Sequence, residues 1–407
     1  MPSCRVCDQK IEPFMSFGPM PIANGFLPKD QFEDEYFFEM EVGFCEICSA
    51  LQLINQPEPE RMFHENYAFF SSLSQHMQNH FKEFASYLIN KYLENRGDPF
   101  IVELGSNDGI MLKHIKDMGY RHLGVEPSNN VADVARSMGI ETISEFFNLD
   151  LAKKIEALHG KADAITCANV MCHIPDINSV AAGIAYLLKP DGILMFEDPY
   201  LGDVIEKVSY DQIYDEHVFI FSARSVSNAF GRHGLELIDV LPQKTHGGSM
   251  RYILAPKGSQ PINQSVTDLM YKEMEQGLGL PETYLKFKNN CEASRENLKN
   301  LLQKLKLESK RIVGYAATSK STTVLNYCGI GPDDIEFISD TTPIKQGKFS
   351  PGVHIPIRNH EAFSNDYPDY ALLFAWNHAT EIFEKEAAFK LSGGNWILFV
   401  PKVVVLE

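Results

Sequence analysis

Three residues near the middle of the chain combine side chains that can carry out proton-transfer chemistry. The stretch YDQIYDEHVF, residues 210–219, places Tyr214, Glu216 and His217 within four positions. A neutral imidazole can accept a proton near pH 7, and a tyrosine hydroxyl can donate to a developing oxyanion. If the segment is helical, Tyr214 and His217 share a face at i and i+3. A solvated helix end would use the same residue types, so the YDEH tetrad, residues 214–217, leaves both interpretations open when taken alone.

Four cysteines form a second constellation. Cys4 and Cys7 repeat the two-residue spacing of Cys45 and Cys48, and 37 residues separate the two pairs. Two such pairs can direct four thiolates at one tetrahedral zinc ion and leave no position open for substrate. We therefore expect a structural zinc site that staples a small segment. Iron suits the same ligand types, and unpaired thiols are the alternative.

A glycine loop predicts a cofactor site. The stretch IVELGSNDGIML, residues 101–112, is an apolar strand followed by a glycine turn and a helix start, where backbone can approach a ligand closely. A dinucleotide site would need G-x-G-x-x-G to admit a pyrophosphate, and the middle glycine is missing here. S-adenosylmethionine carries no phosphate, so its binding does not require the middle glycine. We therefore favour it over a dinucleotide as the cofactor. An empty tight turn is the alternative. The expected cofactor contacts are Glu103, Gly105, Ser106, Asn107, Gly109, Glu126 and Asn169.

Further polar residues are candidates for the substrate cleft. His173 follows a strand end, although a packed histidine fits equally well. The stretch HGGSMR suits sugar or diphosphate contacts or a plain turn, and Ser319 and Lys320 open a helix whose N-terminus suits a diphosphate. The late stretch FAWNH, residues 374–378, would finish a pocket or simply end a strand. The substrate candidates from these motifs and the loop after residue 340 are His173, His246, Ser249, Arg251, Ser319 and Lys345.

Helices and strands must position these residues, and the hydrophobic pattern divides the chain into three parts. The amphipathic helix expected over 74–95 leads into apolar strands that alternate with helices, which predicts a doubly wound parallel α/β sheet. Strands at 235–241 and 250–256 would close it. A polar linker, two long helices and a second α/β alternation follow. The predicted domains are 1–65 for zinc, 66–256 for the cofactor and 257–407 for a Rossmann-like unit.

Composition limits the function classes. The formal net charge of −17, with no basic stripe to offset it, argues against a nucleic-acid partner. The N-terminus has no apolar core of a signal peptide, and no run approaches the 18 apolar residues of a membrane span. We therefore expect a cytoplasmic enzyme with no membrane partner, whose eight cysteines are thiols or metal ligands.

With these motifs in hand, the chain resembles the sugar C-methyltransferases that act on nucleotide-linked 4-keto-6-deoxy sugars. The resemblance covers nearly the whole chain and rests on ELGSNDG, VEPS, HIPD, YDQIYDEHVFIFS, THGGSMRY, the cysteine pairs and the C-terminal GYAATSKSTTVLNYCGIG region. It implies a zinc-bearing N-terminal domain, a class I S-adenosylmethionine fold and a C-terminal domain that helps to hold the nucleotide sugar. In the family's tyrosine-rich stretch, here NYAFFSSLS, only Tyr67 is retained as a tyrosine, so Phe69 and Phe70 can have no hydroxyl role. The resemblance implies that Tyr67 contacts the substrate.

Methylation at carbon requires a carbanion equivalent, which a base can generate next to a ketone. We assign His217 as that base, Tyr214 as the donor to the enolate, and Glu216 to the sugar or to ordering the site. Carbon 3 of the sugar is the expected position. One alternative moves the methyl group to oxygen or nitrogen and needs no enolate. The other is a zinc-bearing scaffold that binds ligands without turnover.

Overall fold

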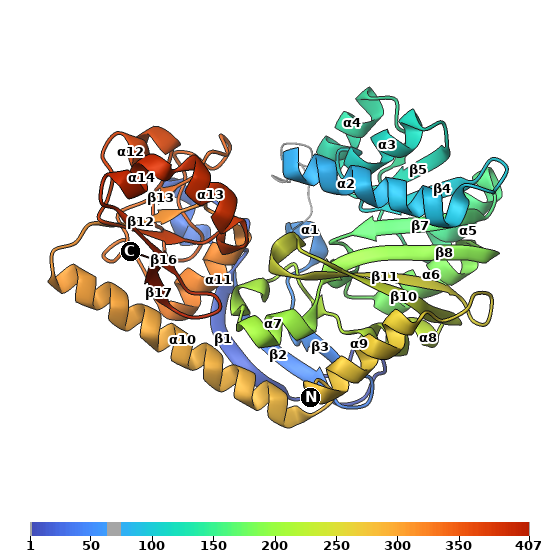
Figure 1. Ribbon diagram of the computed structural model, residues 1–407, viewed down its shortest axis with the longest axis horizontal. Helices are drawn as coiled ribbons and strands as arrows, with labels where there is room; N and C mark the ends of the chain where they lie inside the picture. The colour runs from blue at the N-terminus through green and yellow to red at the C-terminus, as the bar shows by residue number, and fades with distance from the viewer. Residues whose placement is uncertain (1, 63–74, 407) are drawn as a thin grey trace.

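The computed structural model describes residues 2–62 and 75–406, and three β-sheets organise them (Figure 1). The N-terminal sheet has four strands, the central sheet seven and the C-terminal sheet six. In the described part of the chain, no helix is long and apolar enough to cross a membrane. Tyr67 belongs to 63–74 and lies outside the described residues.

The N-terminal sheet has the order β1-β2-β3-β9 and is antiparallel throughout. Its fourth strand comes from the central part of the chain, directly after the YDEH tetrad. The sheet therefore ties the cysteine region physically to residues 214–217. Its elements, with the two short helices of this region, are β1 (Pro13–Pro21), η1 (Lys29–Asp34), β2 (Phe37–Cys45), β3 (Ala50–Leu53), α1 (Pro59–Met62) and β9 (Phe219–Ile220).

The central sheet has the order β10-β11-β8-β7-β4-β5-β6, and its neighbours pair in parallel except around β11. The expectation of a doubly wound sheet closed by the strands near 235 and 250 is confirmed. All five residues of β4 are buried, as expected for a strand covered on both faces. The strands are β4 (Phe100–Leu104), β5 (Arg121–Val125), β6 (Thr142–Ile143), β7 (Ala162–Ala168), β8 (Leu188–Pro199), β10 (Leu235–Gln243) and β11 (Ser249–Pro256).

Neighbouring side chains of β4 point to opposite faces of the central sheet, and different helices cover each face. Ile101 packs in one apolar cluster with Phe84 and Ile115, whereas Val102 packs in another with Ile155 and Ile184. Carboxyl ends of parallel strands meet at one edge, where the cofactor is expected. The helices are α2 (Gln75–Leu88), η3 (a π-helix, Ile89–Leu93), α3 (Ile110–Asp117), α4 (Asn129–Ser137), α5 (Leu149–His159), η4 (Met171–His173), α6 (Ile177–Leu187), α7 (Leu201–Lys207), η5 (Tyr210–Gln212), α8 (Ala223–Gly231) and η6 (Thr245–Gly247).

The C-terminal part begins with two helices, α9 (Gln264–Glu275) and α10 (Pro281–Leu307), where the sequence predicts two long helices. Helix α10 runs along one edge of the molecule toward the C-terminal sheet (Figure 1). That sheet has the order β14-β13-β12-β15-β16-β17. Its elements are β12 (Ile312–Tyr315), α11 (Ser319–Cys328), β13 (Ile338–Ser339), β14 (Ile357–Arg358), α12 (His360–Ser364), β15 (Tyr370–Leu373), η7 (Trp376–His378), α13 (Ala379–Lys385), α14 (Ala387–Leu391), β16 (Asn395–Leu398) and β17 (Val404–Leu406).

Buried aromatic rings join the central and C-terminal parts. Tyr210 packs against Tyr327 and Phe399, with ring centroids 5.5 and 6.2 Å apart. The indole Nε1 of Trp376 donates to the buried carboxylate of Asp211 over 2.7 Å. These contacts position η5 and the tetrad after it. The domain boundaries at 65/66 and 256/257 stay predictions.

Candidate active site

One cavity of about 570 Å³ lies where the three parts meet, within the usual size range of ligand sites. Its wall includes the glycine loop after β4, the loop after β7 and the YDEH tetrad. The N-terminal part adds Asn24, and the C-terminal part adds the start of α11 and the end of η7. The predicted site residues that line it are Gly105, Asn107, Glu126, Asn169, His173, Tyr214, Glu216, His217, His246 and Ser319.

The glycine loop has a backbone that most side chains would not tolerate. Gly105 has a φ of +62°, and a Cβ there would lie 2.4 Å from Cγ2 of Val170. Asn107 takes the position of the missing glycine with a φ of +48°, a conformation that asparagine adopts more readily than most residues. The loop therefore keeps its turn while placing an amide side chain at the cavity.

Glu126 stands at the end of β5 and lines the cavity. Its carboxylate accepts hydrogen bonds from the backbone N–H groups of Asn107 and Ser128, at 2.9 and 2.8 Å. Burial raises its pKa. Each carboxylate oxygen has room for a further donor, which suits ribose hydroxyls. The chemistry of this cradle fits S-adenosylmethionine.

Three of the expected cofactor residues lie beneath the loop instead of on the cavity wall. Glu103 is buried in β4, and burial with the nearby carboxylate of Asp108 raises its pKa well above the usual range. Ser106 fills the space beside Gly124, where a Cβ would meet its Oγ at 2.5 Å. Gly109 caps the start of α3 with a φ of +79°. Their direct contact with the cofactor stays a prediction.

A buried carboxylate holds the loop after β7. Asp198 accepts from the backbone N–H groups of Val170 and Cys172, at 3.1 and 3.0 Å, and burial raises its pKa to about 8. These bonds fix the loop that presents Asn169, with a φ of +56°, and His173 to the cavity. Burial lowers the pKa of His173 to about 4, so its imidazole is neutral.

His217 is held by hydrogen bonds to both ring nitrogens. Its Nδ1 lies 2.7 Å from the carbonyl oxygen of Gln212, which can only accept, so Nδ1 carries the proton. Nε2 is then the acceptor and lies 2.8 Å from the hydroxyl of Tyr214. Burial and the nearby His173 lower the pKa of His217 well below its usual value. The imidazole is therefore neutral, with Nε2 as its basic nitrogen.

The segment that carries this pair is a turn, whereas the shared-face argument from the sequence required a helix. Regular helix ends at Gln212, and the N–H of His217 donates to the carbonyl of Tyr214 over 2.9 Å. The turn still brings the rings of Tyr214 and His217 together, with centroids 4.0 Å apart. Their spacing of three residues therefore produces the expected contact through different backbone geometry.

Glu216 connects the three parts of the molecule. It accepts a 2.6 Å hydrogen bond from Nδ2 of Asn24, whose Oδ1 in turn accepts from the hydroxyl of Ser319 over 3.2 Å. Burial raises the pKa of Glu216 to about 7, against the opposing effects of Asn24 and Lys345. Asn24 has no recognisable motif around it, so only the fold could identify it.

The remaining candidates from the central and C-terminal parts divide between the wall and the interior. His246 lines the cavity, and burial lowers its pKa to about 3. Lys320 lines it too, and burial lowers its pKa to about 8. Lys345 lies behind the wall, where its Nζ donates to the carbonyl of Ala317 over 2.7 Å. Asn377 and His378 of the late FAWNH stretch also reach the cavity.

Two candidates from the HGGSMR stretch are engaged elsewhere. Both Nε and Nη2 of Arg251 donate to Glu197, at 3.2 and 2.9 Å, in a buried ion pair. Ser249 donates its hydroxyl to the carbonyl of Thr245 over 3.1 Å. The structure therefore does not bring these two side chains to the cavity wall.

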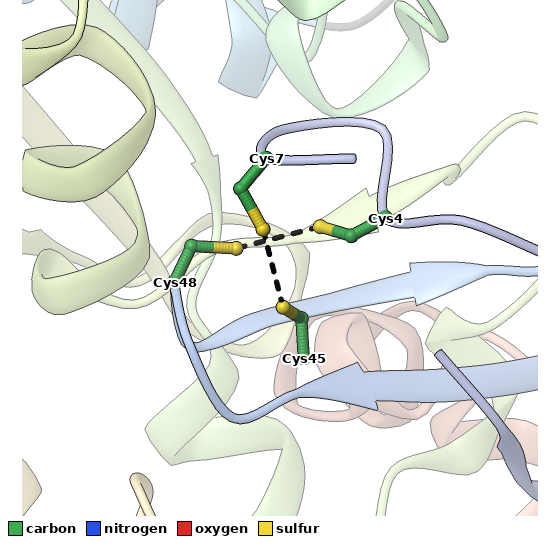
Figure 2. Close-up of side chains that lie close together, drawn as sticks. All are labelled: Cys4, Cys7, Cys45 and Cys48. Carbon is green, nitrogen blue, oxygen red and sulfur yellow. Dashed lines mark hydrogen bonds between the residues drawn. The ribbon is translucent and has the colours of Figure 1, made fainter. Parts of the chain in front are cut away.

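The four N-terminal cysteines converge, as Figure 2 shows. The Sγ atoms of Cys4 and Cys48 are 3.4 Å apart, and those of Cys7 and Cys45 are 3.5 Å apart. Thiolates around tetrahedral zinc stand about 3.8 Å apart, given Zn–S bonds of about 2.3 Å. The residues present therefore fit a closed structural zinc site.

Comparisons with known proteins agree with this geometry. Family models match residues 4–63 (a zinc-binding domain), residues 76–240 (a methyltransferase domain) and residues 244–401 (a C-methyltransferase C-terminal domain). The C-methyltransferase NovU of Streptomyces niveus is 34% identical over 408 residues, which cover 99% of this chain and 96% of that protein.

Other matches cover less of the chain. A ubiquinone biosynthesis O-methyltransferase of Colwellia psychrerythraea is 26% identical over 155 residues, covering 35% of this chain and 63% of that protein. Magnesium protoporphyrin IX methyltransferase of Synechocystis PCC 6803, solved with bound SAM, is 14% identical, with a TM-score of 0.34, and the match covers 44% of this chain and 78% of that one.

The full-length match decides the family. It spans the zinc-binding, methyltransferase and C-terminal regions in one alignment, whereas the O-methyltransferase match is limited to about a third of the chain. The chain therefore belongs to the S-adenosylmethionine-dependent C-methyltransferases that carry an N-terminal zinc-binding domain.

Proposed function

We propose that the enzyme methylates carbon 3 of a nucleotide-linked 4-keto-6-deoxy sugar through an enolate. The observation that carries this proposal is the neutral His217, which lines the same cavity as the cofactor loop and has Nε2 as its basic nitrogen. The resemblance to sugar C-methyltransferases in the motifs of the sequence supports the sugar class. S-adenosylmethionine, when bound, supplies the methyl group as an electrophile.

His217 removes the proton from the carbon next to the ketone. The Gln212 carbonyl holds Nδ1–H, so the proton that arrives at Nε2 creates an imidazolium whose other N–H is already hydrogen-bonded. A general base placed in this way contributes about 10²–10⁴-fold to the rate. The low pKa of His217 keeps the base unprotonated at neutral pH.

Tyr214 stabilises the negative charge that develops on the ketone oxygen. In this structure its hydroxyl lies against Nε2 of His217, so it stands between the base and the space that the substrate would fill. When substrate binds, the hydroxyl turns to the carbonyl oxygen and frees Nε2. One residue thereby protects the base before binding and stabilises the enolate afterwards.

The rest of the sugar nucleotide extends along the C-terminal wall. Glu216, held by Asn24, accepts from a sugar hydroxyl, and the start of α11 with Ser319 and Lys320 faces the diphosphate. We also propose that the reaction takes place in the cytoplasm, where thiols stay reduced and available to bind zinc.

Methyl transfer from ¹³C-methyl-labelled S-adenosylmethionine to a panel of nucleotide-linked 4-keto-6-deoxy sugars tests the proposal. We expect a product methyl group whose carbon shift and couplings show a bond to carbon 3. A methyl group on oxygen or nitrogen would overturn the enolate mechanism. Methylation at carbon 5 would retain the enolate and overturn the assigned position.

A further inference from the structure

Cys172, His173 and His217 form a second cluster of potential metal ligands, apart from the four N-terminal cysteines. One ligand atom from each lies within 4.8 Å of the other two. Cys172 and His173 belong to the loop after β7, and His217 belongs to the tetrad, so the fold brings them together from two places in the chain. Both histidines line the cavity.

This arrangement is close to what a tetrahedral metal ion requires. Zinc bonds of about 2.3 Å to sulfur and about 2.0–2.1 Å to nitrogen place the ligand atoms about 3.4–3.6 Å apart. The imidazole rings are nearly parallel, with an interplanar angle of 25° and centroids 5.3 Å apart. Shifts of about 1 Å in the ligand atoms would bring them to these separations, and a tetrahedral ion with three protein ligands keeps a fourth position open.

The surroundings hold the ligand-bearing residues in place. Hydrogen bonding of Nδ1 to the Gln212 carbonyl leaves Nε2 of His217 with the free lone pair, and such a bond is the usual outer support of a metal-binding histidine. The Tyr214 hydroxyl, 2.8 Å from Nε2, would turn away when a metal ion binds. Asp198 holds the backbone N–H of Cys172 over 3.0 Å and fixes the loop that carries two of the three ligands.

We infer that Cys172, His173 and His217 bind a soft divalent metal ion such as Zn²⁺, and that this binding inhibits methyl transfer. On binding, the Cys172 thiol releases its proton to solvent and coordinates as a thiolate, and both imidazoles donate lone pairs without change of charge. No oxidation state changes. The inhibitory part rests on the proposed function, because the metal occupies the Nε2 of His217 that must accept the substrate proton.

Inhibition by buffered free Zn²⁺ tests the inference on enzyme whose structural zinc is already bound. We expect the parent enzyme to lose activity as free zinc rises. Cys172→Ala should need more than about 100-fold more free zinc for the same inhibition, because losing only an outer partner of a ligand already lowers metal affinity by about 10–100-fold. Cys172→Ser provides a second variant of nearly native size. Cys167→Ala is the matched control, because Cys167 is equally buried in β7 but outside the cluster.

Cobalt(II) binding provides a readout that does not depend on activity. We expect thiolate-to-cobalt charge-transfer absorption in the parent and in Cys167→Ala that exceeds the absorption in Cys172→Ala and Cys172→Ser. Exchange into the N-terminal cysteine site would contribute equally to all four proteins. If no sugar is methylated, the proposed function fails while this comparison still decides the metal site.

Two results would overturn the inference. Equal cobalt absorption in the parent and both Cys172 variants would show that the cluster binds no metal. A cobalt difference together with equal zinc inhibition of the parent and Cys172→Ala would retain the site and overturn its inhibitory role.

Discussion

At the scale of single residues, chemistry at the site depends on which nitrogen of His217 is basic. The carbonyl of Gln212 fixes the proton on Nδ1, and the hydroxyl of Tyr214 marks Nε2 as the acceptor. Because burial lowers the pKa of His217, the imidazole needs no deprotonation before it can act. Tautomer, charge and direction therefore agree with the role of a general base.

Replacement of Tyr214 by phenylalanine should slow turnover without affecting the cofactor. The variant keeps the ring against His217 but loses the donor to the enolate, so we expect kcat to fall by about 10²–10³-fold. Calorimetric affinity for S-adenosylmethionine should stay unchanged. Tyr284→Phe is the control, since its hydroxyl donates to the Leu278 carbonyl outside the cavity wall. A parental kcat in Tyr214→Phe would contradict the assignment.

Lys320 gives the cavity a charge that depends on pH. Burial lowers its pKa to about 8, and Asp211 opposes that shift. Below pH 8 the amine is protonated and attracts a diphosphate, whereas above pH 8 the neutral form dominates. Lys320 also interacts electrostatically with His217 and His246, and Tyr214, Glu216 and His378 line the same cavity.

Affinity for a nucleoside diphosphate such as dTDP should therefore weaken as pH rises. If only the protonated amine binds, a pKa of about 8 makes the dissociation constant about tenfold larger at pH 9 than at pH 7. Lys320→Met should bind weakly at both pH values. Titration calorimetry measures both proteins, and the same slope in Lys320→Met would assign the effect to another group.

At the scale of elements, the cofactor loop depends on the close fit between the ends of β4 and β7. Gly105 has left-handed geometry and touches Val170, whose N–H is fixed by Asp198. Movement of either loop would displace the other. The cofactor cradle and the loop that carries His173 therefore behave as one packed unit.

Gly105→Ala should weaken S-adenosylmethionine binding by about tenfold or more. The new Cβ would lie 2.4 Å from Val170 at a φ of +62°, and strain of about 1–3 kcal/mol displaces the loop. Gly97→Ala is the matched control, because that glycine has open space around it and no positive φ. Equal calorimetric affinities in the two variants would show that the loop does not carry the cofactor.

Periodicity and motif spacing predicted most helices and strands, together with the cofactor-site residues at the strand ends. The buried run of β4, the turn at Gly105 and the acidic Glu126 all follow from local sequence. Asn24 could not be identified in this way, because it reaches Glu216 only through the packing of separate sheets. Arg251 was assigned to substrate from its motif, but the buried Glu197 that binds it lies 54 residues away in sequence.

At the scale of the whole molecule, the cavity requires all three parts. The N-terminal sheet includes β9, which follows His217 in the chain, and the C-terminal part contributes Ser319 and Lys320 to the cavity wall. Trp376 holds the C-terminal part in place through Asp211 and through close contact with Gly247. Substrate contacts therefore depend on the packing of Trp376 between the central and C-terminal parts, whereas the cofactor loop does not depend on this packing.

Trp376→Ala should raise the KM for the sugar nucleotide by about tenfold or more and leave S-adenosylmethionine affinity unchanged. It removes the donor to the buried carboxylate of Asp211, a loss of about 1–3 kcal/mol, together with the ring packed on Gly247. Trp376→Phe keeps a ring and should be intermediate. Steady-state kinetics measures the KM for the sugar nucleotide, and calorimetry measures the affinity for S-adenosylmethionine. An equal weakening of both would contradict the prediction that the Trp376 contacts affect only the substrate side.

Solvent deuterium exchange tests the central claim most directly. The enzyme is incubated in D₂O with a nucleotide-linked 4-keto-6-deoxy sugar and S-adenosylhomocysteine, and proton NMR follows the hydrogen next to the ketone. We predict exchange by the parent enzyme and by the control His122→Gln, whose imidazole lies outside the cavity wall. His217→Gln should exchange about 10²–10⁴-fold more slowly. Exchange at the parental rate in His217→Gln would contradict the role of His217 as the base.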